Sequence, residues 1–208
     1  MAASLIALAY IGCSTAPASN KLIVSSKTTY ISLLRGINVS GQKSIKMADL
    51  KKLYESLGFN DVVSYLQSGN VVFSAPKTAT AKLETKIQEA IQKKYGFDVA
   101  MFVLEPATMH RIRQTNPYLK KKGIDLTRLY VTFLAELSSK LPAAANLTPP
   151  VGSTDEFKVG PQEIYLHCPG GYGKSKLSNN FFEAKLKVQA TTRNWNTVCA
   201  LDDMAGAR

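Results

Sequence analysis

The sequence predicts an α+β protein in which a ferredoxin-like split βαβ unit is followed by a second, less regular α+β unit. The main observation is the order strand, helix, strand, strand, helix, strand, which the apolar pattern follows from Thr29 to Leu104. A second, interrupted series of strand and helix patterns comes after it. The composition, with 45% hydrophobic and 20% charged residues, is typical of a globular protein. With 208 residues, the chain can form one large domain or two of about 100 residues each.

The first 27 residues are expected to be a leader that is disordered or does not belong to the fold. They contain an apolar run, Cys13 and the small residues Ala16-Pro17-Ala18, which also suit an export signal or a lipid-attached cysteine. However, no Lys or Arg precedes the apolar run, and Tyr10 is a poor residue three places before a lipidated cysteine. Export is therefore the second interpretation, and we expect folded units over residues 28–104 and 105–208.

Six elements are predicted in the first unit. A run of apolar, aromatic and β-branched residues indicates a buried strand at Thr29–Arg35, before a loop bracketed by Gly36 and Gly41. Apolar residues recur at helical spacing over residues 46–57 and 79–95, and a glycine follows each of these helices. Ser68-Gly69 is a turn-forming pair that joins two strands in a hairpin. The remaining predicted elements are the hairpin strands over residues 62–67 and 70–74 and a last strand over residues 99–104.

The second unit is predicted from a similar but less regular pattern. Pro106–Gln114 is typical of a helix with proline in its first turn, and Asn116-Pro117 with Lys120–Gly123 predicts an exposed linker. The boundary between the units is therefore expected between Leu104 and Thr127. Strands are predicted over residues 129–134, 156–159 and 163–167, and helices over residues 137–145, 179–186 and 193–204.

Two polar blocks of the first unit, YISLLRGINVSG and YLQSGNVVF, predict a candidate site. The first and third strands of a split βαβ sheet are antiparallel neighbours, so the loop after the first lies beside the hairpin that enters the third. One guanidinium and several amide groups there would suit a planar or anionic ligand. Alternatively, the asparagines satisfy turn backbone groups and the arginine is a surface ion-pair partner. The candidate residues are Arg35, Asn38, Gln67, Ser68 and Asn70.

A third block, TTRNWNTV, predicts the start of a helix that suits an anion. Thr191 or Thr192 can cap a helix whose apolar side contains Trp195. Arg193 would then lie in the first turn, where a cation opposes the helix dipole, so the free N–H groups with Arg193 and Asn194 would suit an anion. The alternative is that Arg193 bends back onto an acidic side chain and that Trp195 belongs to the core.

The remaining motifs identify neither a catalytic pair nor a cofactor. CPGGYGKS ends like a phosphate-binding P-loop but has Cys168 where that pattern needs glycine, which leaves either a looser loop offering Lys174 and Ser175 to a phosphate or a plain exposed loop. His167 and Cys168 are adjacent on a predicted strand and point to opposite faces, unlike a nucleophile and its base. No Cys/His cluster indicates a metal site, and three widely separated cysteines do not form a disulfide framework.

Nucleic-acid binding is the main alternative to a small-molecule site. The chain has 26 Lys and Arg against 15 Asp and Glu, and its net charge of +11 favours acidic partners. Tyr30 and Phe73 could stack on bases if their sheet face were open, as in RNA-recognition modules, but SGNVVFSA lacks the third-strand pattern of those modules. A solvated helix face explains the remaining lysines, which are Lys51, Lys52, Lys82, Lys86, Lys93 and Lys94.

Five blocks in order also resemble one protein family. They are YISLLRGINVSG followed by IKMADLKKLYESLGF, then YLQSGNVVF, EIYLHCPGGYGKSKL and TTRNWNTV. Over about Thr29 to Asp203, the chain resembles the bacterial family known as domain of unknown function 1697. The resemblance implies an α+β fold with ferredoxin-like units and a cytoplasmic bacterial protein, but no established activity and no catalytic residues. One departure is Ser40, where the family's loop commonly has glycine.

We therefore expect binding, with or without turnover, of a phosphorylated or otherwise anionic small ligand. The expected site combines the Arg35/Asn38 loop with the Gln67–Asn70 hairpin, and Lys174, Arg193 and Asn194 join it if the two units pack in that way. Sequence-tolerant RNA or single-stranded DNA binding is the second hypothesis, and a noncatalytic partner-binding scaffold is the third. No stretch approaches the roughly 20 apolar residues of a membrane-spanning helix. The sequence does not decide whether the protein is an enzyme.

Overall fold

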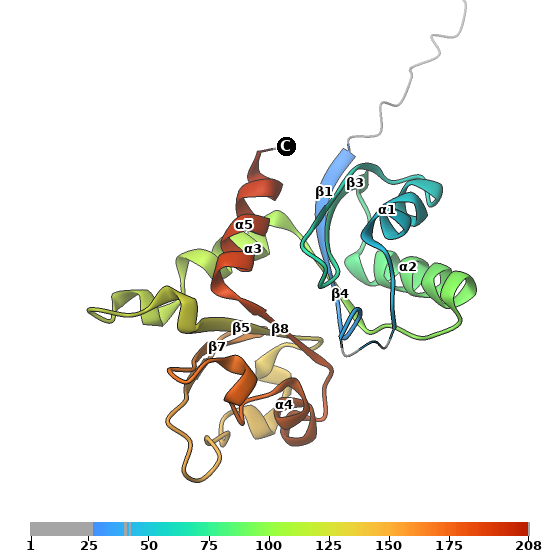
Figure 1. Cartoon of the computed structure of the whole chain (residues 1–208). Coiled ribbons are helices and arrows are strands. Elements are labelled where there is room, and N and C mark those ends of the chain that lie inside the picture. Colours follow the sequence, from blue (N-terminus) through green and yellow to red (C-terminus); the bar gives the residue numbers. More distant parts are fainter. Residues whose placement is uncertain (1–26, 40, 42, 208) are drawn as a thin grey trace, which may run out of the picture.

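The computed structural model describes residues 27–39, 41 and 43–207, so residues 1–26 of the expected leader and Ser40 lie outside the described residues, whereas Lys27 begins the first strand. Two four-stranded antiparallel sheets form the framework, and helices cover their faces (Figure 1). The fold is therefore α+β, as the sequence predicts.

The first sheet has the strand order β2-β3-β1-β4, which is the order of a ferredoxin-like split βαβ unit. The strands are β1 (Lys27–Leu34), β2 (Asn60–Tyr65), β3 (Asn70–Pro76) and β4 (Met101–Leu104), with α1 (Met47–Ser56) and α2 (Thr80–Tyr95) between them. β1 and β3 pair antiparallel, so that Leu33 lies opposite Asn70. Gly96 ends α2 in the left-handed conformation, as its position in the sequence predicts.

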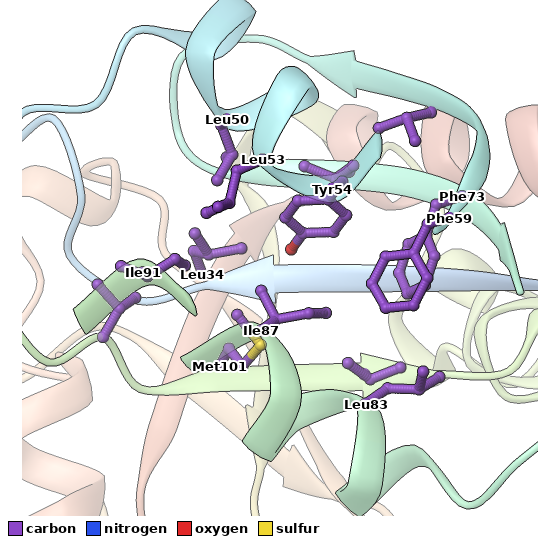
Figure 2. Close-up of a cluster of buried hydrophobic side chains, with 14 of the residues drawn as sticks. Leu34, Leu50, Leu53, Tyr54, Phe59, Phe73, Leu83, Ile87, Ile91 and Met101 are labelled. Carbon is purple, nitrogen blue, oxygen red and sulfur yellow. The ribbon is translucent and has the colours of Figure 1, made fainter. Parts of the chain in front are cut away.

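The main core of this unit lies between the first sheet and the helices α1 and α2. Figure 2 shows Leu34 and Phe73 of the sheet facing Leu50, Leu53 and Ile87 of the helices. Tyr30 and Phe73 are fully buried on this side of the sheet. The idea that these two rings stack on nucleic-acid bases at an open sheet face is therefore wrong, because packing against the helices has taken up both of them.

The second sheet has the strand order β6-β7-β5-β8. Its strands are β5 (Leu129–Leu134), β6 (Glu156–Val159), β7 (Glu163–His167) and β8 (Ala190–Asn194). Between β7 and β8 lies α4 (Asn179–Leu186), and Phe182 of this helix packs with Leu134 and Leu166 in a core on one face of the sheet.

Two helices fill the space between the sheets. These are α3 (Pro106–Gln114) and α5 (Trp195–Gly206), which lie side by side in Figure 1. Their apolar residues pack with Ile31 and Val72 of the first sheet and with Val131 of the second. Trp195 belongs to this shared core, in which it is buried. The second face of the first sheet is therefore covered as well, and the two sheets share one continuous hydrophobic contact.

The predicted helix over residues 193–204 begins later than expected. Residues 190–194 form β8, which pairs antiparallel with β5 and places Thr192 opposite Thr132. The helix α5 begins at Trp195, and the Oδ1 of Asn194 caps it by accepting a hydrogen bond from the Thr197 N–H (2.8 Å). Neither Thr191 nor Thr192 is the cap, and Arg193 is not in a helical turn. The β-branched threonines at 191 and 192 favour a strand, and a partner strand far away in sequence stabilises it.

Two further expectations need correction. The helix predicted over residues 137–145 consists of short 3-10 turns at Ser138–Lys140 and Pro142–Ala144. In the predicted exposed linker, Lys120–Gly123 is exposed but Asn116 and Tyr118 are buried, because Pro117–Lys120 forms a 3-10 turn that packs onto the fold. None of the helices in the described part of the chain combines the length and apolar character needed to cross a bilayer.

Candidate functional site

A pocket of about 420 Å³ lies where the loop after β1 and the β2–β3 hairpin meet β8 and the start of α4. Both units therefore contribute to its wall. Three of the predicted site residues, Arg35, Ser68 and Arg193, line this pocket together. The other lining residues are Leu34, Gly36, Ile37, Val39, Tyr172, Ser178, Asn179, Asn180, Thr191 and Thr192.

Arg193 reaches from β8 to the first unit and uses all five of its N–H groups in hydrogen bonds. All five acceptors are neutral oxygen atoms: the Asn70 side chain (2.6 Å), the carbonyls of Leu34 (2.7 Å), Ser68 (3.2 Å) and Thr192 (2.8 Å), and the Thr191 hydroxyl (2.9 Å). This side chain therefore fixes the end of β1 and the hairpin against β8.

The charge of Arg193 is not neutralised by a carboxylate among the residues that the structure describes. The alternative in which Arg193 bends onto an acidic side chain is thus wrong. The residue is only 8% exposed, and burial lowers the pKa of its guanidinium to about 10, so it remains charged at neutral pH. Because the local dielectric is low, a buried cation without a counter-ion gives the pocket that it lines a positive potential.

Arg35 makes the reverse connection, from the first unit to the second. Its Nε donates to the carbonyl of Ala190 (3.0 Å), and its Nη2 donates to Oδ1 of Asn180 (3.1 Å) and Oε2 of Glu183 (2.6 Å). The interpretation of Arg35 as an ion-pair partner is therefore correct, but this pair joins two units. The side chain is 30% exposed, and its Nη1 has no hydrogen-bond partner among the described residues. Arg35 can therefore still donate to a ligand.

The asparagines of the two blocks hold the loop and the hairpin together. Asn38 has a positive φ of 57°, and its side chain bonds to Ile45 N (2.8 Å), Ile45 O (2.9 Å) and Gln67 O (2.8 Å). Asn70 is buried, and its Nδ2 donates to Tyr65 O (3.0 Å) and Ser68 Oγ (2.9 Å). Both amides satisfy local groups, as the alternative interpretation expects. Gln67 is exposed and does not line the pocket.

Several pocket residues were not predicted from the sequence. The Tyr172 hydroxyl donates to Thr192 Oγ1 (3.0 Å), which in turn donates to Asn179 Oδ1 (2.6 Å). Burial raises the pKa of Tyr172, so its hydroxyl stays protonated and can donate. Tyr172 belongs to the glycine-rich loop, so that this loop brings an aromatic hydroxyl to the pocket. The helix α4 itself was predicted over residues 179–186, and its N-cap Ser178, whose Oγ accepts from Phe181 N (3.3 Å), is the sequence signal that could have drawn attention to the residues at its start.

Two further predicted site residues, Lys174 and Asn194, lie outside this pocket, as do Asn38, Gln67 and Asn70. Lys174 ends a 3-10 turn after Tyr172 and is not among the lining residues, and Asn194 is occupied as the cap of α5. Cys168 is buried, and burial raises the pKa of its thiol to about 11, which disfavours the nucleophilic thiolate. Its Sγ contacts Ser175 Oγ (3.6 Å), whereas the His167 ring lies against Tyr118, so the two side chains are not a catalytic pair.

The hairpin glycine Gly69 gives a test of how tightly the pocket is framed. A Cβ at Gly69 would lie 2.7 Å from Leu34 Cβ and 2.8 Å from Ile37 Cδ1, whereas a Cβ at Gly36 would meet no atom within 4 Å. Both glycines have positive φ, +74° and +70°. We expect Gly36→Ala to lower the free energy of unfolding by about 1 kcal/mol through backbone strain alone. Gly69→Ala should cost about 2–4 kcal/mol because steric overlap adds to the strain. Urea unfolding measures both losses, and equal losses would contradict the close packing at Gly69.

Comparison with known proteins supports the fold and gives no activity. A family model described as "Protein of unknown function (DUF1697)" matches residues 27–165. Among solved structures, a conserved bacterial protein from Streptococcus pneumoniae has a TM-score of 0.69 to this chain at 23% sequence identity, covering 86% of this chain and 99% of that one. At this identity, the likeness shows a shared fold alone. Curated proteins include no significant sequence match.

Proposed function

We propose that this chain, which belongs to the DUF1697 family of proteins of unknown function, binds a small anionic ligand in the pocket between its two units. The observation that carries the proposal is the lining of this pocket, which contains the guanidinium groups of Arg35 and Arg193 and no carboxylate among the described residues. An anion there would lower the cost of the buried Arg193 charge.

The two arginines would act differently on such a ligand. Arg193 already uses its five N–H groups within the protein, so it contributes through its charge and through the shape that it gives the pocket. Arg35 has a free Nη1 among the described residues and is partly exposed, so it can donate directly to an anionic oxygen. The ligand would compete with Glu183 for this side chain.

The start of α4 supports the same position for the anion. Asn179 and Asn180 are the first two residues of this helix, and both line the pocket. Backbone N–H groups in the first turn have no intrahelical acceptor, and the helix dipole favours negative charge at this end. Together with Arg35, these groups suit a phosphate or a carboxylate.

The size of the pocket favours a small molecule over a polymer. Its volume of about 420 Å³ is within the range of roughly 300–1,000 Å³ that is usual for small-ligand sites. In contrast, both faces of the first sheet are covered by helices, which removes the open surface that RNA-recognition modules use.

The proposal predicts that pyrophosphate, used as a model anion, raises the thermal unfolding temperature of the protein. At a concentration of about 100 times Kd, the added stability should be about 2.7 kcal/mol. Arg35→Gln should weaken binding about tenfold, because it removes one charge-assisted donor. Differential scanning fluorimetry over a pyrophosphate series, with each variant compared with its own ligand-free state, measures this effect.

Lys185→Gln is the matched control. Like Arg35→Gln, it removes one positive charge, but Lys185 is a residue of α4 that does not line this pocket. It should leave the pyrophosphate response nearly unchanged. If both variants lost the response equally, with a steep dependence on salt, binding would depend on the overall positive charge, and the nucleic-acid hypothesis would gain instead.

A further inference from the structure

The residues around the pocket differ in chemistry from one side to the other. The side from β8, α4 and the glycine-rich loop presents hydroxyl, amide and guanidinium groups, as in Tyr172, Asn179 and Arg193. On the side from the end of β1 and its following loop, the apolar lining residues are Leu34, Ile37 and Val39, of which Leu34 and Ile37 are buried and Val39 is exposed. A simple inorganic anion at Arg35 and the start of α4 would leave Val39 uncovered.

Val39 is the most exposed apolar residue of this lining. Its exposed fraction is 57%, although the neighbouring Asn38 is fixed by hydrogen bonds to Ile45 and to the carbonyl of Gln67. The backbone before Val39 is therefore held in place. An exposed valine beside a fixed residue and inside a pocket wall favours contact with an apolar part of a ligand.

A second exposed apolar residue lies on the hairpin that this loop contacts. Leu66 is 55% exposed and has a positive φ of 57°, a conformation that is rare and costly for a bulky side chain. Leu66 is not itself a lining residue, but it precedes Gln67, whose carbonyl accepts the hydrogen bond from Asn38, and it is two residues from Ser68, which lines the pocket. Val39 and Leu66 thus flank the contact between loop and hairpin, and we call these two residues the apolar rim.

We infer that the ligand is amphipathic: an anionic group binds at Arg35 and the start of α4, and an aryl or alkyl group attached to it covers the apolar rim. The inference rests on the proposed function, since it concerns the same pocket. It adds the class of ligand, which is a phosphate ester or carboxylate with an apolar substituent. Contact of this substituent with the apolar rim should strengthen binding about tenfold over the bare anion.

Three probes separate the anionic group from the apolar one. They are inorganic phosphate, glycerol phosphate, which has a polar substituent, and phenyl phosphate, which has an apolar substituent. Titration calorimetry of the full chain should give about tenfold tighter binding for phenyl phosphate than for the other two. Arg35→Gln should weaken all three, because each probe carries the anion.

Substitutions in the rim should act on phenyl phosphate alone. Val39→Ser is expected to reduce the affinity for phenyl phosphate about three- to tenfold without changing the affinity for inorganic phosphate. Val63→Ser is the matched control, because Val63 is also an exposed valine but does not line the pocket. Leu66→Asn should weaken phenyl phosphate and at the same time raise the unfolding temperature, since asparagine tolerates a positive φ.

The possible results separate this inference from the proposed function. Equal affinities for the three probes, each lowered by Arg35→Gln, would overturn the amphipathic ligand and leave the anion site in place. Absence of binding by all three would overturn both. Preference for phenyl phosphate that Val39→Ser removes and Val63→Ser keeps is the result that the structure predicts.

Discussion

Replacing Arg193 with alanine is expected to lower the free energy of unfolding by about 3–5 kcal/mol, a large part of the stability of a typical domain. The side chain is the donor in five hydrogen bonds, and its removal leaves five oxygen atoms of a largely buried interface without donors. Three of these acceptors belong to the first unit, so the variant should also loosen the hairpin against β8. Urea unfolding followed by circular dichroism measures the loss.

Two comparisons make this prediction specific. Arg193→Lys keeps the charge but has three donors and no planar fork, so it should lose most of the same stability. Arg128→Ala removes an arginine that is 44% exposed and lies 3.6 Å from Asp125, and it should cost less than about 1 kcal/mol. If Arg193→Ala cost no more than Arg128→Ala, the interface would not depend on this side chain.

The second large effect is expected at Arg111, where α3 meets β7. Its Nη1 and Nη2 donate to the two carboxylate oxygens of Glu163 at 2.7 and 2.8 Å, and Glu163 is fully buried. Tyr165 also donates to this carboxylate (2.9 Å). Arg111→Ala should cost about 3–5 kcal/mol, because it leaves a buried carboxylate without its cation.

Substitution of the partner residue, Glu163, should lower the free energy of unfolding by less. Arg111 is 36% exposed, so after Glu163→Gln its guanidinium can turn toward water, and the loss should be about 1–2 kcal/mol. The double variant with Arg111→Met and Glu163→Leu should recover part of the loss seen for Arg111→Met alone, since neither charge remains. Urea unfolding of the single and double variants gives the coupling between the two residues, and additive losses would contradict a coupled pair.

Local sequence patterns were sufficient to predict the first sheet and its helices. The run of apolar, aromatic and β-branched residues around Tyr30, the helical spacing around Leu50 and the glycines that follow each helix are local patterns, which the sequence displays directly. The known order of split βαβ strands then placed the loop after the first strand beside the hairpin that enters the third, and the pairing of Leu33 with Asn70 confirms it. Here local preference and tertiary contacts point to the same arrangement.

The error at β8 has the opposite origin. The segment Thr191–Asn194 is followed by a clear apolar helix pattern, and its partner, β5, lies about sixty residues earlier in the chain. Nothing local indicates that pairing. Once Arg193 is assigned to a strand, its five acceptors come from both units, so its role depends on contacts that a sequence pattern does not contain.

The candidate site was predicted only in part, again because some of its residues come together through contacts between distant parts of the chain. Arg35 and Ser68 follow from strand order, whereas Tyr172 and Asn179 reach the pocket only through the packing of the second unit onto the first. Asn38 and Asn70 were selected because they are polar residues in turns, and the structure gives each of them a local framework role, to which Asn70 adds a hydrogen bond from Arg193. Turn-forming asparagines therefore located the site without being its free donors.

The most direct test of an anion site between the units is a nuclear magnetic resonance titration of isotope-labelled protein with pyrophosphate. We predict saturable shifts concentrated at the backbone amides of Gly36, Ser68, Asn179 and Asn180, which line the pocket, and their loss in Arg35→Gln. Shifts spread over the exposed lysines of α1 and α2, or no saturable shift at all, would contradict the account.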